Sequence, residues 1–109
     1  MNLADRERRG GGKLEVITGI GWYRREQWER LRELSADVER LEDTYDEWLS
    51  GAERLLKDLR SRGVAAARVD VDVEELSRWC AEQRRRVDSA ARANFVAVKL
   101  RERDPRNPS

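Results

Sequence analysis

Two pairs of acidic residues are the side chains in this sequence whose type and spacing come closest to a metal site. Glu26 precedes Glu29 by three residues. Asp43 precedes Asp46 by the same interval. On a helix this spacing places both carboxylates of a pair on one face, and carboxylate oxygens are the ligands that Mg²⁺ and Ca²⁺ prefer. The four residues are a candidate metal site, and an exposed acidic face with salt bridges is the alternative interpretation.

The motifs Glu26-x-x-Glu29 and Asp43-x-x-Asp46 are loosely similar to the paired acidic motifs of all-helical nucleotide pyrophosphohydrolases. That resemblance implies magnesium held between helices and a metal-dependent, nucleotide-hydrolysing all-α enzyme. The family begins its second motif with glutamate, where this chain has Asp43. The acids also fall on the outer face of the helical pattern described below, so the sequence favours a solvated face.

A run of three arginines, Arg84, Arg85 and Arg86, is the basic cluster of the chain, and Trp79 precedes it. Arginines beside an aromatic ring are a pattern that can bind the phosphates of nucleic acids or another anion. Asp88 follows the cluster, and the whole chain has 23 Lys and Arg against 22 Asp and Glu. The charge balance therefore does not favour a nucleic-acid partner.

Several other chemistries are excluded by residues that the sequence lacks. It has no histidine and one cysteine, Cys80, so it offers neither a four-ligand zinc set nor a Ser-His or Cys-His pair. We expect no cofactor, and Cys80 is expected to be a small buried apolar side chain. No apolar run is long enough to span a membrane, and the N-terminus lacks the apolar segment of a signal peptide. We expect a cytoplasmic protein without a membrane partner.

The elements that would position these residues are mainly helices. Charged residues make up 41% of the chain and hydrophobic ones 39%, with two prolines, a composition typical of long amphipathic helices. Apolar residues alternate at spacings of three and four, a heptad seam, at Leu31, Leu34, Val38, Leu41, Tyr45, Trp48, Ala52, Leu55 and Leu59. The pattern predicts a long helical arm or a helical hairpin over residues 24–62. A break is expected at Ser35–Asp37, and Thr44 with Glu47 has the spacing of a capping box.

Two shorter helices are predicted after this arm. Alternating valines at residues 69–73 indicate a short extended segment, and Asp72 is spaced to cap a helix that runs to about Gln83. Asp88 and Ser89 open a last helix from Ala90 to about Arg103, which is expected to be largely buried; its FVAV run leaves a strand as the alternative.

The phrase ITGIGWY, at residues 17–23, is predicted to be a structural clasp. Residues 14–18 read as a strand that could pair with residues 66–71. Gly19 and Gly21 would then permit a tight turn or a close approach, while Trp22 and Tyr23 pack on the helix that follows. An exposed aromatic recognition surface is the alternative.

The predicted fold class is mainly α: a long amphipathic arm or helical hairpin plus two shorter helices, with a small two-stranded β element as an option. Residues 13–103 are expected to form a single helical domain. Residues 1–12 and 104–109 are expected to be disordered tails, because they are rich in charged and helix-breaking residues.

The order of blocks GWYRREQWERL, LEDTYDEWL, VDVDVEELSRWC and SAARANFVAVKL resembles a group of short uncharacterised bacterial proteins. The resemblance covers about residues 17–103. It implies no activity and assigns no site residue, because no established activity is associated with that group.

The favoured function is a non-catalytic protein–protein interaction or oligomerisation domain. Two short helices cannot cover the whole apolar seam, so we expect a two-fold homodimer, with another protein as a further partner. The expected interface residues share the seam and its flank: Trp28, Leu34, Leu41, Tyr45, Trp48 and Leu55. Asp43 and its acidic neighbours are expected to meet the arginine cluster around this interface.

Overall fold

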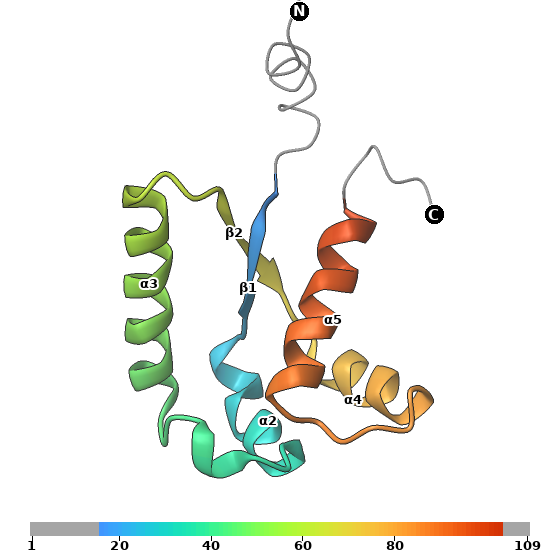
Figure 1. The fold of residues 1–109 in the computed structure, drawn as a ribbon. Helices are drawn as coiled ribbons and strands as arrows, with labels where there is room; N and C mark the ends of the chain where they lie inside the picture. The colour runs from blue at the N-terminus through green and yellow to red at the C-terminus, as the bar shows by residue number, and fades with distance from the viewer. Residues whose placement is uncertain (1–15, 104–109) are drawn as a thin grey trace, which may run out of the picture.

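The computed structural model describes residues 16–103, which form a small sheet flanked by helices (Figure 1). The elements follow in the order β1 (Thr18–Trp22), η1 (Arg25–Gln27), α2 (Trp28–Leu34), η2 (Val38–Arg40), α3 (Tyr45–Ser61), β2 (Ala66–Asp70), α4 (Val73–Glu82) and α5 (Ser89–Glu102). The two strands are parallel, with Thr18 opposite Ala66. The fold is thus mainly helical with a small β element. The predicted tails, residues 1–12 and 104–109, lie outside the described residues.

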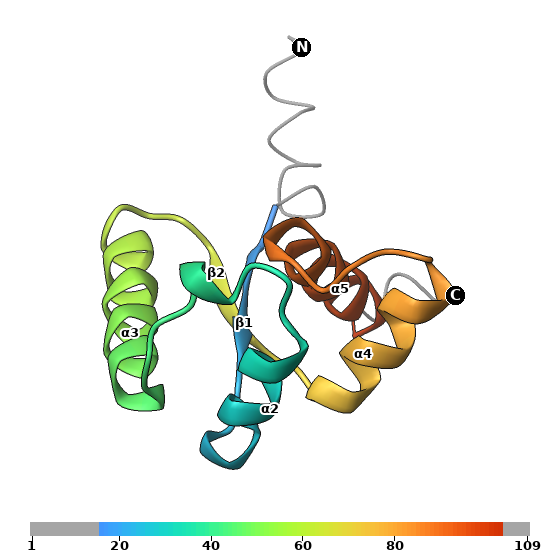
Figure 2. The ribbon, with the colours of Figure 1, turned by 90° about the horizontal axis from the view of Figure 1, so that it is seen from below.

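The sheet lies between α3 on one side and α5 on the other (Figures 1 and 2). On the α3 side, the rings of Trp22 and Trp48 pack with their centroids 5.4 Å apart. On the α5 side, a Cβ built on Gly19 would meet Cγ1 of Val96 at 3.0 Å, and one built on Gly21 would meet Cγ2 of the same valine at 3.0 Å. The missing side chains of these two glycines therefore let α5 approach the sheet closely.

The predicted long arm or helical hairpin is not found in the described structure, where no single helix spans residues 24–62. Its helical pattern is divided among α2, η2 and α3. The break predicted at Ser35–Asp37 is confirmed: Ser35 has extended backbone angles, and its hydroxyl donates a 2.7 Å hydrogen bond to the carbonyl of Leu31. This bond ends α2, and the chain then reverses direction. The apolar residues of the seam therefore pack onto the core of the same chain.

Two predicted capping residues, Thr44 and Asp72, lie where two helices begin. The Thr44 hydroxyl accepts the Glu47 N–H at 3.1 Å, and the Glu47 carboxylate accepts the Thr44 N–H at 3.2 Å, which confirms the capping box at the start of α3. The Asp72 carboxylate accepts the Glu75 N–H at 3.0 Å at the start of α4. Each side chain satisfies a backbone donor that the first helical turn leaves unpaired.

The strand and the last helix differ in detail from their predictions. β1 runs through Gly19 and Gly21 to Trp22 and begins where the predicted strand ends. The FVAV run is helical, as predicted for α5, but that helix is not largely buried. It buries Ala91, Phe95 and Val96 on one face, while other positions, including Ala93, are exposed. Alanine is small enough to occupy either kind of face, which is why the sequence pattern did not distinguish them.

Replacing Gly19 by alanine is expected to destabilise the fold by about 1–3 kcal/mol, because the new methyl group would press on Val96 and Val69 at 3.0 and 3.1 Å. Gly51, inside α3, is the matched control: a Cβ there meets nothing within 4 Å. Gly51→Ala should therefore stabilise the protein by up to about 1 kcal/mol through helix propensity. Urea unfolding of both variants measures the difference. Equal effects of the two substitutions would contradict the close packing of α5 on β1.

Candidate functional site

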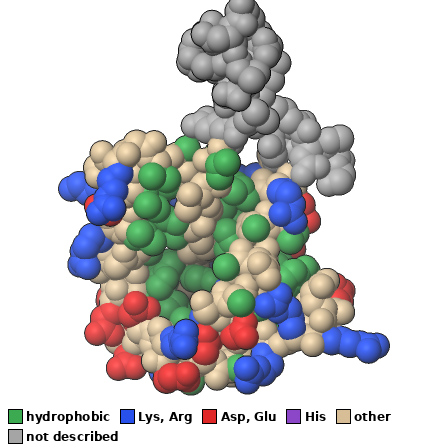
Figure 3. All heavy atoms as spheres, in the orientation of Figure 1, with side chains coloured by type: hydrophobic (Ala, Val, Ile, Leu, Met, Phe, Trp, Pro, Cys, Tyr) green, Lys and Arg blue, Asp and Glu red, His purple; other side chains and the backbone are tan. Residues whose placement is uncertain are grey.

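A groove of about 380 Å³ runs between α3 and α5 along β1. Figure 3 shows apolar side chains on both of its sides, in the same orientation as Figure 1. The lining residues come from β1, α2, α3, α5 and their connections: Thr18, Gly19, Ile20, Gly21, Tyr23, Trp28, Leu41, Trp48, Leu55, Leu59, Ser89, Arg92, Ala93 and Val96. Four consecutive residues of β1 are among them. A strand lines a cavity with consecutive residues when its backbone edge, rather than one face, borders that cavity.

The hydrogen bonds at the two ends of the sheet show which backbone groups of β1 point toward this groove. The Thr18 N–H donates to the carbonyl of Ala65 at 2.8 Å, and the Trp22 carbonyl accepts the N–H of Val71 at 3.0 Å. In a parallel pair every second residue bonds to the same neighbour. Gly19 and Gly21 therefore direct both their N–H and their C=O away from β2. Within residues 16–103 these four groups have no hydrogen-bond partner.

The outer edge of β2 is treated differently. By the same alternation, Ala66 and Arg68 point away from β1. The Arg60 guanidinium donates to the carbonyl of Ala66 at 3.1 and 3.2 Å, and the Arg103 guanidinium donates to the carbonyl of Arg68 at 2.8 Å. Arginine side chains therefore occupy two acceptors of this edge. Charged side chains along an edge strand are a common means of preventing further strand pairing.

Aromatic rings close one end of the groove. Trp48 of α3 stacks on Trp28 with ring centroids 5.5 Å apart, and Tyr23 and Tyr45 contact the same pair. The Tyr45 hydroxyl donates to the carbonyl of Tyr23 at 2.8 Å. Burial raises the pKa of Tyr23 to about 12, so its phenol stays neutral at physiological pH. The aromatic side chains at this end of the groove are therefore uncharged, and a neutral phenol with a raised pKa is not suited to act as a general base.

The groove also contains a buried donor. Trp28 is 2% exposed, and its indole Nε1–H is without a partner in the described structure. A buried donor without a partner usually costs stability. Trp28 belongs to the core as well as to the groove wall, so its primary role is packing.

The predicted interface residues are divided between the core and the groove. Leu34, Leu41, Tyr45 and Trp48 are partly buried against the core, and Trp28 is fully buried. Leu55 is 47% exposed, one of the large hydrophobic side chains that remain accessible. The clasp residues Gly19, Gly21 and Tyr23 line the groove, whereas Trp22 packs on Trp48 outside that lining. The arginine cluster and the acidic residues are not part of it.

The four acidic candidates do not assemble into a metal site in the described residues, where no group of three potential ligands lies close enough to hold an ion. Asp46 pairs with Arg25 at 2.8 Å, and Asp43 lies 3.9 Å from Arg32. Glu26 lies 3.8 Å from the guanidinium of Arg24. No such partner is found for Glu29 in residues 16–103. The break at Ser35–Asp37 separates the two motifs, and the first of them lies across the junction of η1 and α2.

The arginine cluster follows the end of α4. Arg84 adopts a left-handed conformation, with φ of 56°. The N–H groups of Arg84 and Arg85 bond to the carbonyls of Ala81 and Cys80, the pattern of a Schellman motif. Arg85 lies 5.9 Å from the Trp79 ring centroid. Arg84 and Arg85 therefore end α4, and Arg84 occupies the left-handed position at which glycine is usual.

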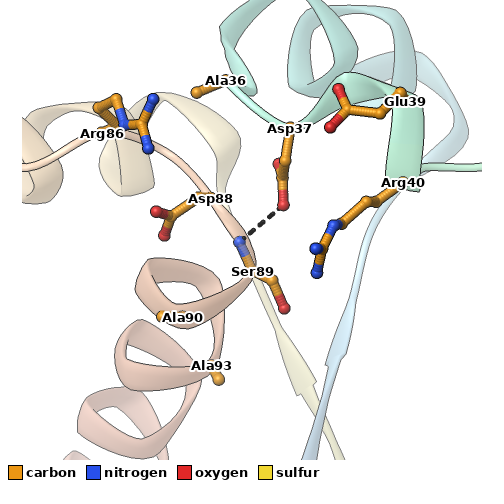
Figure 4. Close-up of a pocket in the computed structure, with 9 residues that line it drawn as sticks. All are labelled: Ala36, Asp37, Glu39, Arg40, Arg86, Asp88, Ser89, Ala90 and Ala93. Atoms are coloured by element: carbon orange, nitrogen blue, oxygen red, sulfur yellow. Dashed lines mark hydrogen bonds between the residues drawn. The ribbon is translucent and has the colours of Figure 1, made fainter.

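Arg86 lies at the rim of a second, larger cavity of about 620 Å³ at the start of α5 (Figure 4). Arg40 faces this cavity from η2, but Asp37, Glu39 and Asp88 also line it. The Asp37 carboxylate accepts the Ser89 N–H at 2.9 Å. The acidic side chains offset the charge of the two arginines, and Asp37 already accepts the N–H of Ser89. The cavity is therefore not a basic phosphate pocket.

Cys80 is 1% exposed, and burial raises the pKa of its thiol. A buried protonated thiol is a poor nucleophile.

Among residues 16–103, none of the helices combines the length and the apolar character that a membrane span requires.

Sequence reasoning missed two features of the site. One is the open edge at Gly19 and Gly21, which became visible only when the strand was placed four residues later than predicted. The other is the ion pair of Asp37 and Arg92, whose two residues are far apart in the sequence.

No family model, curated protein or solved structure matches this chain.

Proposed function

We propose that this chain is a non-catalytic protein–protein interaction domain that forms a homodimer through the groove between α3 and α5. The observation that carries the proposal is the groove itself, an apolar surface that lies over free backbone groups of β1. Leu55 stays 47% exposed in its wall. Covering such a side chain is favourable, by roughly 25 cal/mol for each Å² removed from water.

The proposal uses the part of the apolar seam that the core leaves uncovered. Leu41, Trp48 and Leu55 reach the groove, and Leu59 extends their line. Leu34 and Tyr45 were expected at the interface from the sequence, and they contribute indirectly by packing on the core that holds α3 in place. A partner binding in the groove would therefore contact α3, β1 and α5 together.

The test is the mass in solution, measured by light scattering on a sizing column over a range of protein concentrations. We expect twice the 12.8 kDa of one chain, and the dimer should persist at high salt because its centre is apolar. Leu55→Lys should weaken dimerisation by at least about tenfold, equivalent to about 1.4 kcal/mol, because a charge would have to be buried in the groove.

Ser50→Lys is the matched control for that variant. It places the same charge on an exposed position of α3 outside the groove lining, so the mass should not change. A monomer at all concentrations would contradict the proposed homodimer. Equal weakening by the two variants would show that dimerisation does not depend on the groove.

A further inference from the structure

We infer that the occupant of the groove is β1 of a second copy, paired antiparallel to β1 so that the two sheets join into one four-stranded sheet. This inference rests on the proposed homodimer and specifies its geometry. Its starting point is the difference between the two edges of the sheet. Arginine side chains occupy carbonyls of the β2 edge, whereas the β1 edge keeps the N–H and C=O groups of Gly19 and Gly21 free within residues 16–103.

The spacing of these free groups fits a two-fold axis. A two-fold axis between adjoining edges makes the two strands antiparallel. If Ile20 lies on the axis, Gly19 faces Gly21 of the second copy, and Gly21 faces its Gly19. Each such pair exchanges two hydrogen bonds, so all the free N–H and C=O groups of these glycines in both chains obtain a partner. The hydrogen bonds between β1 and β2 remain as they are in this arrangement.

The helix α3 has a charge distribution that suits this symmetry. Acidic residues gather at its N-terminal end: Glu42, Asp43, Asp46 and Glu47. Basic residues outnumber acidic ones in its second half and at its C-cap: Arg54, Lys57, Arg60 and Arg62, against Glu53 and Asp58. Figure 3 shows these two signs at opposite ends of α3. Because α3 runs alongside β1 (Figure 1), an axis at Ile20 sets two α3 helices antiparallel, and each acidic end lies toward a basic end.

The helix α5 suits the same arrangement on the other side of the sheet. Its exposed residues include Ala90, Ala93 and Ala97, whose spacing of three and four places them on one stripe of the helix. The distance between packed helices depends on the side chains at the contact. Alanines allow two α5 helices to approach across the axis where larger side chains would keep the strands apart.

The decisive test is a disulfide at the expected axis, formed in the full chain. Two facing residues without hydrogen bonds between them have Cα atoms about 4.5 Å apart, within the range of a disulfide. Ile20→Cys should therefore form a covalent dimer under mild oxidation. Arg68→Cys is the matched control, because Arg68 lies opposite Ile20 in the register but on the other strand. We expect Ile20→Cys to cross-link at least about tenfold faster than Arg68→Cys, and wild type, with Cys80 buried, not to cross-link.

Amide hydrogen exchange of the wild-type chain, followed by NMR, gives an independent measurement. In the dimer the N–H groups of Gly19 and Gly21 should exchange at least about tenfold more slowly than the N–H of Arg68, which points outward from the β2 edge. Dilution of the dimer should remove the protection of the glycines.

The outcomes separate this inference from the proposed function. A dimer in which Ile20→Cys does not cross-link and the glycine amides exchange freely would overturn the strand pairing and leave the homodimer intact. A wild-type monomer would overturn both. A monomer with protected glycine amides would place a segment of the same chain on the edge. Protection that arises only when an extended peptide is added would assign the edge to a foreign strand. Either of the last two results would overturn the self-pairing.

Discussion

Asp37→Ala is expected to lower the free energy of unfolding by about 3 kcal/mol, because it leaves the Arg92 guanidinium without its carboxylate in a largely buried site. The two side chains are 14% and 12% exposed and form a bidentate pair with distances of 2.8 and 3.0 Å. Asp37 also accepts the Ser89 N–H, so one carboxylate joins the break after α2 to the first turn of α5. Chemical denaturation measures the loss.

The exposed pair of Arg25 and Asp46 provides the control. Its nitrogen–oxygen distance is also 2.8 Å, but its side chains are 63% and 75% exposed. Exposed ion pairs contribute little, so Asp46→Ala should leave the unfolding transition nearly unchanged. Similar losses in the two variants would show that the burial of Asp37 does not matter.

The same pair should give a pH dependence. Hydrogen bonding to Arg92 holds the pKa of Asp37 below its ordinary value. A carboxyl with a lowered pKa in the folded state contributes stability above its unfolded pKa of about 3.9, and that contribution is lost as the pH falls through the folded pKa. The stability difference between wild type and Asp37→Ala should therefore shrink in acid.

Trp28→Ala is expected to destabilise the protein by about 3–5 kcal/mol, the usual cost of removing a large aromatic side chain from a core. The Trp28 ring contacts Tyr23, Tyr45 and Trp48, with centroid distances of 6.2, 6.1 and 5.5 Å. These contacts join α2, α3 and the end of β1. Removing the ring should also loosen the wall of the groove, so dimerisation should weaken together with stability.

Trp28→Phe separates packing from the unpaired indole donor. Phenylalanine keeps most of the apolar contact and removes the Nε1–H that has no partner in the described residues. Relief of that unpaired donor offsets part of the lost volume, and we expect a cost well below that of Trp28→Ala, because the cavity left behind is smaller. A cost for Trp28→Phe as large as that for Trp28→Ala would mean that the indole nitrogen has a partner in solution.

Local signals in the sequence were sufficient to predict where α2 ends and where α3 and α4 begin. Thr44 and Asp72 are capping residues whose bonds depend only on the next three residues, and both positions begin helices in the structure. Ser35 marks the break for a similarly local reason, since its hydroxyl competes for the Leu31 carbonyl. These features can be predicted without knowledge of the tertiary fold.

The arrangement of the helices was not predictable from the same signals. The heptad seam indicated one arm, but a heptad pattern does not say whether its partner is another chain or the sheet of the same chain. Here Trp48 packs on Trp22 of β1. The pairing of β1 with β2, and of Asp37 with Arg92, depends on contacts between distant segments. No local pattern encodes them.

The open edge could be found only after the strand had its correct limits. A prediction that ends the strand at Thr18 treats Gly19 and Gly21 as turn residues, for which free backbone groups are ordinary. The observed strand runs through both glycines to Trp22. The absence of side chains at these positions then has a second explanation, since Val96 of α5 occupies the space.

The parallel pairing of β1 with β2 also determines how the chain can reach this fold. Residues 23–65, which include α2 and α3, separate the two strands, and a loop of that length must close before any bond of the ladder forms. Closing it costs entropy that local helix formation does not, and topologies with such distant contacts fold slowly for their size. During that interval β1 has both edges unpaired, so the segment rich in glycine and tryptophan is most exposed to wrong pairing while the chain is still folding.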